Sequence, residues 1–232
     1  MAGTRTAFLF NGKDNFNIGS FQVYNGLLFE YIKSRFMSRQ YCTSCERPLV
    51  TCICKFCCSI NNEVEVWFLQ HTSEEKQAKG TAKLASLCLT HSKILIGEDF
   101  SDNQQLNKLL TDPSKQVYLL YPEQSAVVAK ALTKSERKNT VILILDGTWK
   151  KAYLMYQLST NLHPLAKITL ASGIKSEYRI RKHHKESDVS SLEACAHALV
   201  ALEDDKLKYQ PLFNSFAQFN DFQLSLRKNN QK

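Results

Sequence analysis

The stretch VILILDGTW, residues 141–149, decides the fold class of this chain. Its first five residues are apolar and rich in β-branched side chains, which is typical of a strand buried on both faces of a parallel sheet. Asp146 follows at the carboxyl end of this strand, where open α/β sheets bind their ligands. Gly147 allows a sharp turn, and the apolar residues from Trp149 onward recur at helical spacing. The stretch therefore predicts a strand, a turn and a helix over 149–158.

Asp146 has two interpretations at this position. Aspartate is a common N-cap residue, so its carboxylate could simply cap the helix that follows. It could equally be an active-site group, since ligands bind at this edge of an α/β sheet and carboxylates serve there as acids and bases. The stretch taken alone does not separate the two interpretations.

Strand-like and helix-like segments alternate over most of the chain. Ser190 and Glu193 form a capping box before one helix, and Thr72 and Glu75 form another. Pro211 is placed to open the last, Phe-rich helix. The alternation predicts an α/β layered protein with a mainly parallel sheet and flanking helices. The predicted strands are 63–69, 93–96, 117–120, 141–145 and 167–170, and the predicted helices are 72–90, 124–132, 149–158, 192–202 and 212–226, with weaker helical signals at 26–37 and 102–110.

The charge balance is basic, with 30 basic against 22 acidic residues and a net charge of +8. This favours a polyanionic partner such as nucleic acid, with general solubility as the alternative. No apolar run approaches the length of a membrane span, and residues 1–12 lack the apolar core of a signal peptide. We therefore expect a cytoplasmic protein with no membrane association.

Six of the eight cysteines lie within residues 42–58. Because the expected compartment is reducing, such a dense group is more typical of a metal site than of disulfides, with free or redox-active thiols as the alternative. Four thiolates on two short turns suit the tetrahedral coordination of a structural Zn²⁺, and four such ligands leave no open position for catalysis. The spacing predicts the ligands Cys42, Cys45, Cys52 and Cys54, with Cys57 and Cys58 as spare thiols that could replace the fourth.

The cysteine-rich segment separates two other parts of the chain. We expect an N-terminal extension over residues 1–40, a zinc-binding knuckle over 41–59 and an α/β domain over 60–232. The remaining two cysteines, Cys88 and Cys195, fall in predicted helices and are expected to be small buried apolar groups.

A basic segment, residues 175–185, precedes the helix that Ser190 caps. Its charges could bind the phosphates of a polynucleotide, with Tyr178 stacking on a base. The alternative is a solvated surface loop, which most charge runs are. Its position before a helix N-terminus favours an anion site. The cationic candidates are Lys175, Arg179, Arg181 and Lys182, while the neighbouring His183 and His184 lack the spacing of metal ligands.

Two residues near the first strand carry weaker signals. His71 directly precedes Thr72, and a histidine that supports the helix start or the core is favoured over a catalytic one. Gly80 falls inside the predicted helix 72–90, where glycine costs about 1 kcal/mol relative to alanine. Close backbone packing or the approach of a ligand would explain a glycine there.

Four motifs together resemble the DTW-domain proteins. They are C-x₂-C-x-R-P-x₃-C-x-C at residues 42–54, DGTW at 146–149, Y-x-x-R-K at 178–182 and SLEA at 191–194. The resemblance covers about residues 41 to 205. It implies a transfer-RNA uridine aminocarboxypropyltransferase with an α/β fold related to SPOUT proteins, which have a knotted cofactor site. Such an enzyme moves the 3-amino-3-carboxypropyl group of S-adenosylmethionine to N3 of a uridine and releases methylthioadenosine.

The resemblance also implies roles for individual residues. Asp146 would act as general base on the uridine N3–H or orient the imide, within a catalytic set that includes Thr148 and Trp149. Trp149 could stack on the uracil, wall the pocket or face the core. Where many relatives have His-Pro, this chain has His71-Thr72. The cofactor would bind where three loops converge, at Leu120, Tyr121, Pro122, Gly147, Leu170, Ser172 and Gly173. The methionine carboxylate or the RNA backbone would be held by Tyr178, Arg179, Arg181 and Lys182.

Three rival functions remain open at this stage. Related folds use the same cofactor for methyl transfer, and a more distant branch of the superfamily modifies ribosomal RNA. The chain could also be a non-catalytic, zinc-binding RNA-binding protein, although the intact DGTW motif argues against decay of the site. The sequence does not predict the oligomeric state or which uridine is modified.

Overall fold

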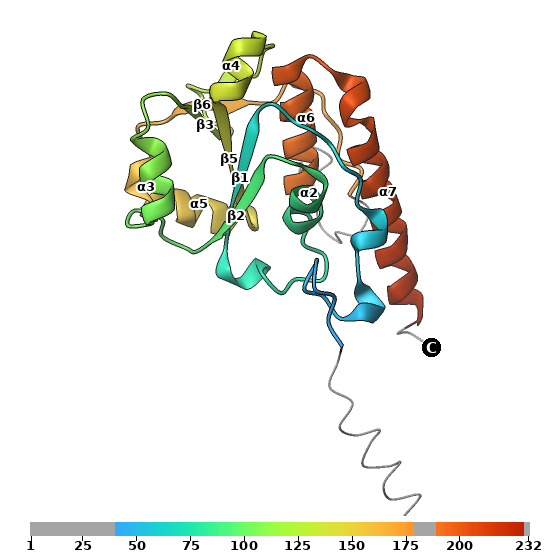
Figure 1. Cartoon of the computed structure of the whole chain (residues 1–232). Coiled ribbons are helices and arrows are strands. Elements are labelled where there is room, and N and C mark those ends of the chain that lie inside the picture. The colour runs from blue at the N-terminus through green and yellow to red at the C-terminus, as the bar shows by residue number, and fades with distance from the viewer. Residues whose placement is uncertain (1–39, 179–188, 230–232) are drawn as a thin grey trace, which may run out of the picture. The chain divides into compact units, whose positions relative to one another are not determined.

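The computed structural model describes residues 40–178 and 189–229 (Figure 1). For residues 228 and 229, only the backbone is described. The predicted helix over 26–37 lies outside the described residues, as do Arg179, Arg181 and Lys182 and the two neighbouring histidines. The chain divides into Met1–Gln40 and Tyr41–Lys232, and the architecture below is that of the second unit.

The centre of this unit is a six-stranded sheet in the order β2-β1-β5-β3-β6-β4. Every paired neighbour runs parallel, so the predicted mainly parallel α/β sheet is confirmed. The strands are β1 (Glu65–Gln70), β2 (Ser92–Ile96), β3 (Gln116–Leu120), β4 (Val127–Val128), β5 (Thr140–Asp146) and β6 (Ala166–Thr169).

Helices cover both faces of the sheet, and each face has its own apolar core (Figure 1). One face packs against α2 (Ala82–Cys88), α6 (Ser191–Glu203) and α7 (Lys206–Asn229). The other packs against α3 (Gln104–Leu110) and α5 (Trp149–Leu158). Alternate residues of β5 enter the two cores, which explains its continuous apolar sequence. Ile142 and Ile144 belong to the first core, and Val141 and Leu143 belong to the second.

The strand order creates a switch point between β1 and β5. The chain leaves β1 toward β2 on one side of the sheet and leaves β5 toward β6 on the other. The loops that follow these two strands therefore run in opposite directions, and open α/β sheets commonly bind ligands at such a point. Gln70 and Asp146 are paired in the sheet here, each as the last residue of its strand.

Most predicted elements are present within a few residues. All five predicted strands are confirmed, as are the helices at 149–158 and 192–202. The weak helical signal at 102–110 corresponds to α3, and both halves of the capping box formed by Ser190 and Glu193 are made. Cys88 and Cys195 are buried, as expected. A short helix that was not predicted, α4 (Lys134–Asn139), precedes β5 and has its own capping box at Thr133.

The predicted helix over 72–90 is wrong in its first half. A short 3₁₀ helix, η3 (Thr72–Glu74), follows β1, and the α-helix begins only at Ala82. The N–H of Ser73 is accepted by Nδ1 of His71, so the cap-supporting role predicted for this histidine is confirmed and Thr72 is not the cap.

Contacts from remote side chains explain why residues 78–80 are not helical. Arg47 donates to the carbonyls of Ala78 (2.8 Å) and Gly80 (3.0 Å), while the Tyr178 hydroxyl donates to the carbonyl of Lys79 (2.6 Å). These carbonyls therefore bond outside the segment instead of within a helix. Gly80 precedes α2, so the cost of a glycine inside a helix does not arise.

Two other predictions are wrong for reasons of packing. Residues 124–132 form no helix, because the β-branched pair Val127–Val128 extends along the edge of the sheet and pairs with β6. Pro211 does not open the last helix, which begins at Lys206 and contains the proline. The buried face of α7 already includes Tyr209, so tertiary burial overrides the proline signal. Phe216 and Phe219 are buried on the same helix, as predicted.

None of the helices in the described part of the chain combines the length and the apolar character that a membrane span requires. The path of the chain from Tyr178 to Val189 runs through residues outside the description. A knot depends on that path, so the knotted, SPOUT-like arrangement stays a prediction.

Candidate functional site at the carboxyl edge of the sheet

Asp146 is a buried carboxylate at the carboxyl end of β5, with an exposed fraction of 5%. One carboxylate oxygen accepts a hydrogen bond from Nε2 of Gln70 (2.7 Å), and the other accepts from the hydroxyl of Ser191. The N-cap of α5 is Thr148, whose hydroxyl accepts from the N–H of Lys151. Asp146 therefore does not cap the helix, and its carboxylate bridges the ends of β1 and β5 and the start of α6.

A cavity of about 360 Å³ opens beside this carboxylate. This volume lies within the range of roughly 300–1,000 Å³ that small-molecule sites occupy. Its walls come from the carboxyl ends of three adjacent strands, β5, β3 and β6, and from the first turns of α5 and α6. The lining is mostly apolar and consists of Leu120, Tyr121, Pro122, Ile144, Leu145, Gly147, Trp149, Ala152, Thr169, Leu170, Val189, Ser191 and Ala194.

The three loops that the sequence analysis assigned to the cofactor all contribute to this cavity. Five of the seven predicted cofactor residues are in its lining: Leu120, Tyr121, Pro122, Gly147 and Leu170. The other two, Ser172 and Gly173, are exposed and lie outside it. Gly173 has a φ of +88°, the left-handed region, so it serves the turn that follows β6.

Trp149 forms part of the cavity wall and is half exposed, at 50%. The indole of Trp149 therefore does not face the core. Tyr121, which also lines the cavity, stacks on Tyr156 with ring centroids 4.8 Å apart. Burial raises the pKa of the Tyr121 phenol, with a further contribution from Tyr156. The cavity wall thus includes two aromatic side chains, Tyr121 and Trp149.

The loops after β1 and β5 are tied to each other. The N–H of His71 donates to the carbonyl of Asp146 (3.0 Å). From α5, Lys151 reaches the loop after β1 and pairs with Glu74 (2.9 Å). A Cβ atom on Gly147 would lie 3.2 Å from Cβ of Lys151 and 3.6 Å from Cβ of His71. Close approach of the two loops, and not an unusual φ, therefore makes glycine suitable at this position.

Tyr178 lies in the core and not on the surface. It is 4% exposed, its ring centroid is 5.5 Å from that of Phe216, and its hydroxyl donates to the carbonyl of Lys79. A ring packed in this way is not open to a nucleobase, so we withdraw the predicted stacking role. The other predicted binding residues, Arg179, Arg181 and Lys182, lie outside the described residues.

Glu193 anchors the start of the basic segment to α6. Its buried carboxylate accepts from the N–H of Ser190 (2.7 Å), the N–H of Glu177 (2.6 Å) and the hydroxyl of Ser176. The capping box signalled the first of these bonds, but nothing in the sequence signalled the other two. Ser176 and Glu177, at the start of the basic segment, are therefore held beside the first turn of α6, whose Ser191 bonds Asp146.

Several residues of the candidate site were not assigned a role from the sequence. Gln70 had a signal, since a polar residue that ends an apolar strand is a candidate for a buried hydrogen bond. Ser191 was noted only as part of a motif, and its contact with Asp146 spans 45 positions in the sequence. Small apolar residues such as Ala152 and Ala194 had no signal, because they contribute only room.

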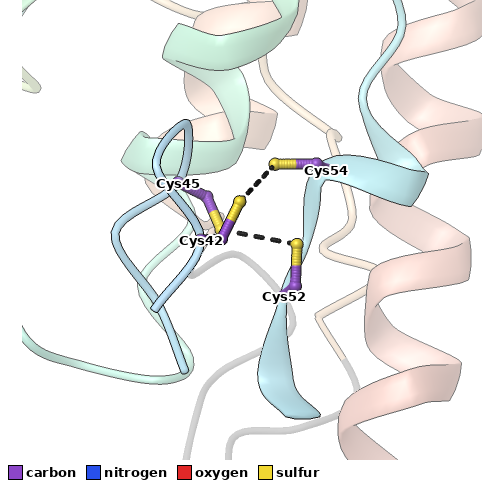
Figure 2. Close-up of side chains that lie close together, drawn as sticks. All are labelled: Cys42, Cys45, Cys52 and Cys54. Carbon is purple, nitrogen blue, oxygen red and sulfur yellow. Dashed lines mark hydrogen bonds between the residues drawn. The ribbon is translucent and has the colours of Figure 1, made fainter. Parts of the chain in front are cut away.

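A second candidate site lies in the cysteine-rich segment. Figure 2 shows Cys42 and Cys45 on one turn facing Cys52 and Cys54 on another. The four sulfur atoms lie within 4.8 Å of one another, with 3.5 Å between Cys42 and Cys54 and 3.7 Å between Cys45 and Cys52. A tetrahedral ion with metal–sulfur bonds of about 2.3 Å separates its ligand sulfurs by about 3.8 Å. The four predicted cysteines therefore form a cluster that could hold a metal ion.

The surroundings of the cluster suit a structural ion. The sulfur of Cys42 accepts hydrogen bonds from the backbone N–H groups of Cys45 and Ser44, which lower its pKa to about 6, whereas burial raises the pKa of Cys54. Cys45 is 2% exposed and belongs to the same apolar core as Ile53. Cys57 is not part of the group, and its thiol points to the carbonyl of Ile53. Among the described residues, Cys54 is thus the fourth member.

The sequence of this chain is similar to those of known proteins. The model of the DTW domain family matches residues 39–224. Similar curated proteins include three that are named tRNA-uridine aminocarboxypropyltransferase 2. The Drosophila melanogaster protein is 34% identical over 172 residues, which cover 71% of this chain and 67% of the fly protein. The Macaca fascicularis and Mus musculus proteins are 29% and 25% identical over 192 and 191 residues, in each case 80% of this chain and 64% of the relative.

The chain therefore spans about two thirds of the length of these relatives. No solved structure matches it significantly. The family match covers the cysteine cluster, Asp146 and the start of α6, so it includes both candidate sites. The chain belongs to the DTW domain family.

Proposed function

We propose that this chain is a tRNA-uridine aminocarboxypropyltransferase. It transfers the 3-amino-3-carboxypropyl group of S-adenosylmethionine to N3 of a uridine and releases methylthioadenosine. Membership of the DTW domain family and the names of the relatives support the proposal. The observation that carries it is the cavity at the carboxyl edge of the sheet, whose wall includes a hydroxyl bonded to a buried carboxylate.

The cavity suits the nucleoside end of S-adenosylmethionine. Its walls from β3 and β6 are apolar, with Leu120, Pro122 and Leu170 among them, and apolar surface is what a purine ring requires. Ser191 brings a polar group to the cavity, at the start of α6. S-adenosylmethionine would then bind with its adenosine against the apolar residues of β3 and β6 and with its reacting carbon near Ser191.

Asp146 supplies the base that the reaction needs. The N3–H of uridine is a weak acid, so N3 attacks the γ-methylene of the cofactor only when its proton is removed. The carbon–sulfur bond then breaks and its electron pair stays on sulfur, which leaves as methylthioadenosine. The proton ends on the carboxylate of Asp146 and passes to solvent.

Ser191 connects Asp146 to the cavity. Ser191 is in the lining, whereas the carboxylate of Asp146 lies behind it and accepts its hydroxyl proton in a hydrogen bond. The hydroxyl takes the proton of N3 while it gives its own proton to Asp146. Gln70 positions the base, because it holds the second carboxylate oxygen and so turns the first toward Ser191.

Trp149 and the basic segment hold the substrates. The half-exposed indole of Trp149 is a surface on which the uracil stacks after it leaves the base stack of the RNA. Thr148 fixes the direction of this turn, because it caps α5. Arg179, Arg181 and Lys182 bind either the carboxylate of the cofactor or the RNA backbone, both of which are anionic.

Cys42, Cys45, Cys52 and Cys54 hold a structural Zn²⁺, which supplies no reaction chemistry. A thiolate cluster with this spacing is stable in a reducing compartment, and the cytoplasm is the compartment that we propose. Such an ion joins the two turns of the segment and fixes them beside the core that contains Cys45.

The test uses the full chain, S-adenosylmethionine and unmodified tRNA, followed by digestion to nucleosides and measurement of their masses. A uridine heavier by one aminocarboxypropyl group is the expected product. A methyl adduct would keep the cofactor but replace the reaction with methyl transfer. No adduct on tRNA, with an adduct on ribosomal RNA, would change the substrate. RNA binding without any adduct and without S-adenosylmethionine binding would indicate a binding protein.

A further inference from the structure

We infer that the exposed face of α5 formed by Trp149, Lys150 and Tyr153, termed here the α5 ridge, binds the RNA nucleotide next to the target uridine. The inference rests on the proposed function and extends it, because it names the surface that receives the substrate outside the cavity. The partner is RNA with unpaired bases, such as a tRNA loop.

The α5 ridge exposes two aromatic rings side by side on one helix. Trp149 and Tyr153 are four positions apart in the sequence, so they lie on the same face of the helix about one turn apart. They are 50% and 58% exposed, whereas Met155 on the opposite face is buried. Exposed neighbouring aromatic rings mark a site of interaction more often than a bare surface.

The ridge is continuous with the cavity. Trp149 belongs both to the cavity wall and to the ridge, and Tyr153 lies one turn further along the helix. A uridine that enters the cavity must leave its own stack, and its neighbour in the chain then loses a stacking partner as well. The ring of Tyr153 lies where that neighbour can stack again.

The charge of the ridge suits a phosphate. Lys150 is exposed, and among the residues that the structure describes it has no acidic partner. The adjacent Lys151 differs, since it is paired with Glu74 and bonded to Ser73. An exposed lysine beside two exposed rings is the combination with which single-stranded nucleic acid is bound, namely stacking platforms together with backbone neutralisation.

A second copy of the chain is the competing occupant. Leu154 and Leu158, which are 48% and 42% exposed, lie further round α5 and could extend an apolar interface. The ridge itself favours RNA because it pairs a lysine with its aromatic rings and begins at the cavity. Leu154 is therefore a matched control, being an exposed apolar residue on the same helix but outside the ridge.

The experiment measures tRNA affinity by fluorescence anisotropy and steady-state transfer for the full chain and its variants. We expect Tyr153→Ala to weaken tRNA binding and to raise KM for tRNA by roughly 5- to 50-fold, the loss that follows removal of one stacked base. The kcat and the KM for S-adenosylmethionine stay nearly unchanged. Tyr153→Phe keeps the ring and restores binding. Lys150→Gln reduces the dependence of log affinity on log salt by about 0.7, as for one contact to a single strand.

Every other outcome either overturns the inference or shows that the proposed function has failed. If the wild-type chain transfers nothing, the proposed function fails, and the tRNA affinities of the same variants still decide the inference. Unchanged affinity and KM in Tyr153→Ala overturn it. Equal losses in Tyr153→Ala and Leu154→Ala, accompanied by a change from dimer to monomer in sedimentation, overturn it in favour of a second copy.

Discussion

The cysteine cluster and the carboxyl edge of the sheet are built in opposite ways. All four sulfurs of the cluster come from residues 42–54, on two adjacent short turns. The edge draws on segments that range from Gln70 to Ala194, and its central hydrogen bond joins residues 45 positions apart. A site built from local spacing is encoded by a motif, whereas a site built from distant segments exists only when the sheet has formed.

This difference separates their expected consequences. The cluster includes Cys45, a core residue, so a change there alters the stability of the fold. At the edge, the carboxylate of Asp146 bonds side chains from β1 and α6 without contributing an apolar contact to either core. We therefore expect changes at the edge to alter transfer while the fold persists. The predictions below test this separation.

Asp146→Ala is expected to have the largest effect. It removes the proposed base and the acceptor of both Gln70 and Ser191, so we expect transfer to fall by about 10³-fold or more, within the range for loss of general base catalysis. Binding of tRNA stays nearly unchanged. Nucleoside masses measure transfer and anisotropy measures binding. Asp102→Ala, at an exposed aspartate, is the control and keeps its activity. Wild-type turnover in Asp146→Ala would remove the base from the mechanism.

Cys42→Ser is expected to act on stability. Loss of one of four thiolates should release the proposed ion, so we expect metal content to fall from about one ion per chain toward zero. The free energy of unfolding decreases by roughly 3 kcal/mol, which is the scale of losing a cross-link between chain segments. Elemental analysis and denaturant unfolding measure the two quantities. Cys57→Ser keeps the ion, because Cys57 lies outside the cluster. A wild-type chain that is fully folded without metal contradicts the prediction.

The same contrast explains what could be predicted from the sequence. The segment 141–158 was read correctly because its apolar run and its helical spacing are strong local signals. The four clustered cysteines were likewise identified from spacing. Elements and sites that depend on a single local pattern were therefore predicted from the sequence.

Errors arose where a distant contact overrides a local signal. The segment before α2 has helical propensity, but Arg47, Tyr178 and Gln223 from remote positions bind its carbonyls. Tyr178 was assigned to the surface because basic residues follow it, yet its ring packs on Phe216. Such contacts depend on how α7 and residues 41–59 pack. The residues next to a wrongly predicted segment carry no signal for that packing.

Ser191→Ala and Ser190→Ala form a matched pair of neighbours with opposite expected effects. Ser191 lines the cavity and bonds Asp146, so its loss lowers the rate of transfer by roughly 10- to 100-fold and leaves stability nearly unchanged. Ser190 caps α6 through the N–H of Glu193, so its loss decreases stability by about 1 kcal/mol and spares the rate. Single-turnover transfer and denaturant unfolding are measured for both. Equal rates in the two variants would exclude the hydroxyl of Ser191 from the proton path.

Gly147→Ala is expected to have the smallest effect and to test the edge most finely. The added Cβ would lie 3.2 Å from Cβ of Lys151, so α5 must shift by a few tenths of an ångström, at a cost of about 1 kcal/mol. Gly97→Ala is the control, because its Cβ would lie 3.1 Å from the ring of Phe100, a core residue outside the cavity lining, and because the Gly97 N–H bonds the backbone carbonyl of Gln70 and not the side chain that holds Asp146. Both variants should lose similar stability in denaturant unfolding. Only Gly147→Ala should also slow transfer, because the shift displaces Asp146 relative to Ser191 and alignment of reacting groups controls the rate. Equal slowing in both would mean that the edge responds to general loosening of the sheet and not to its own geometry.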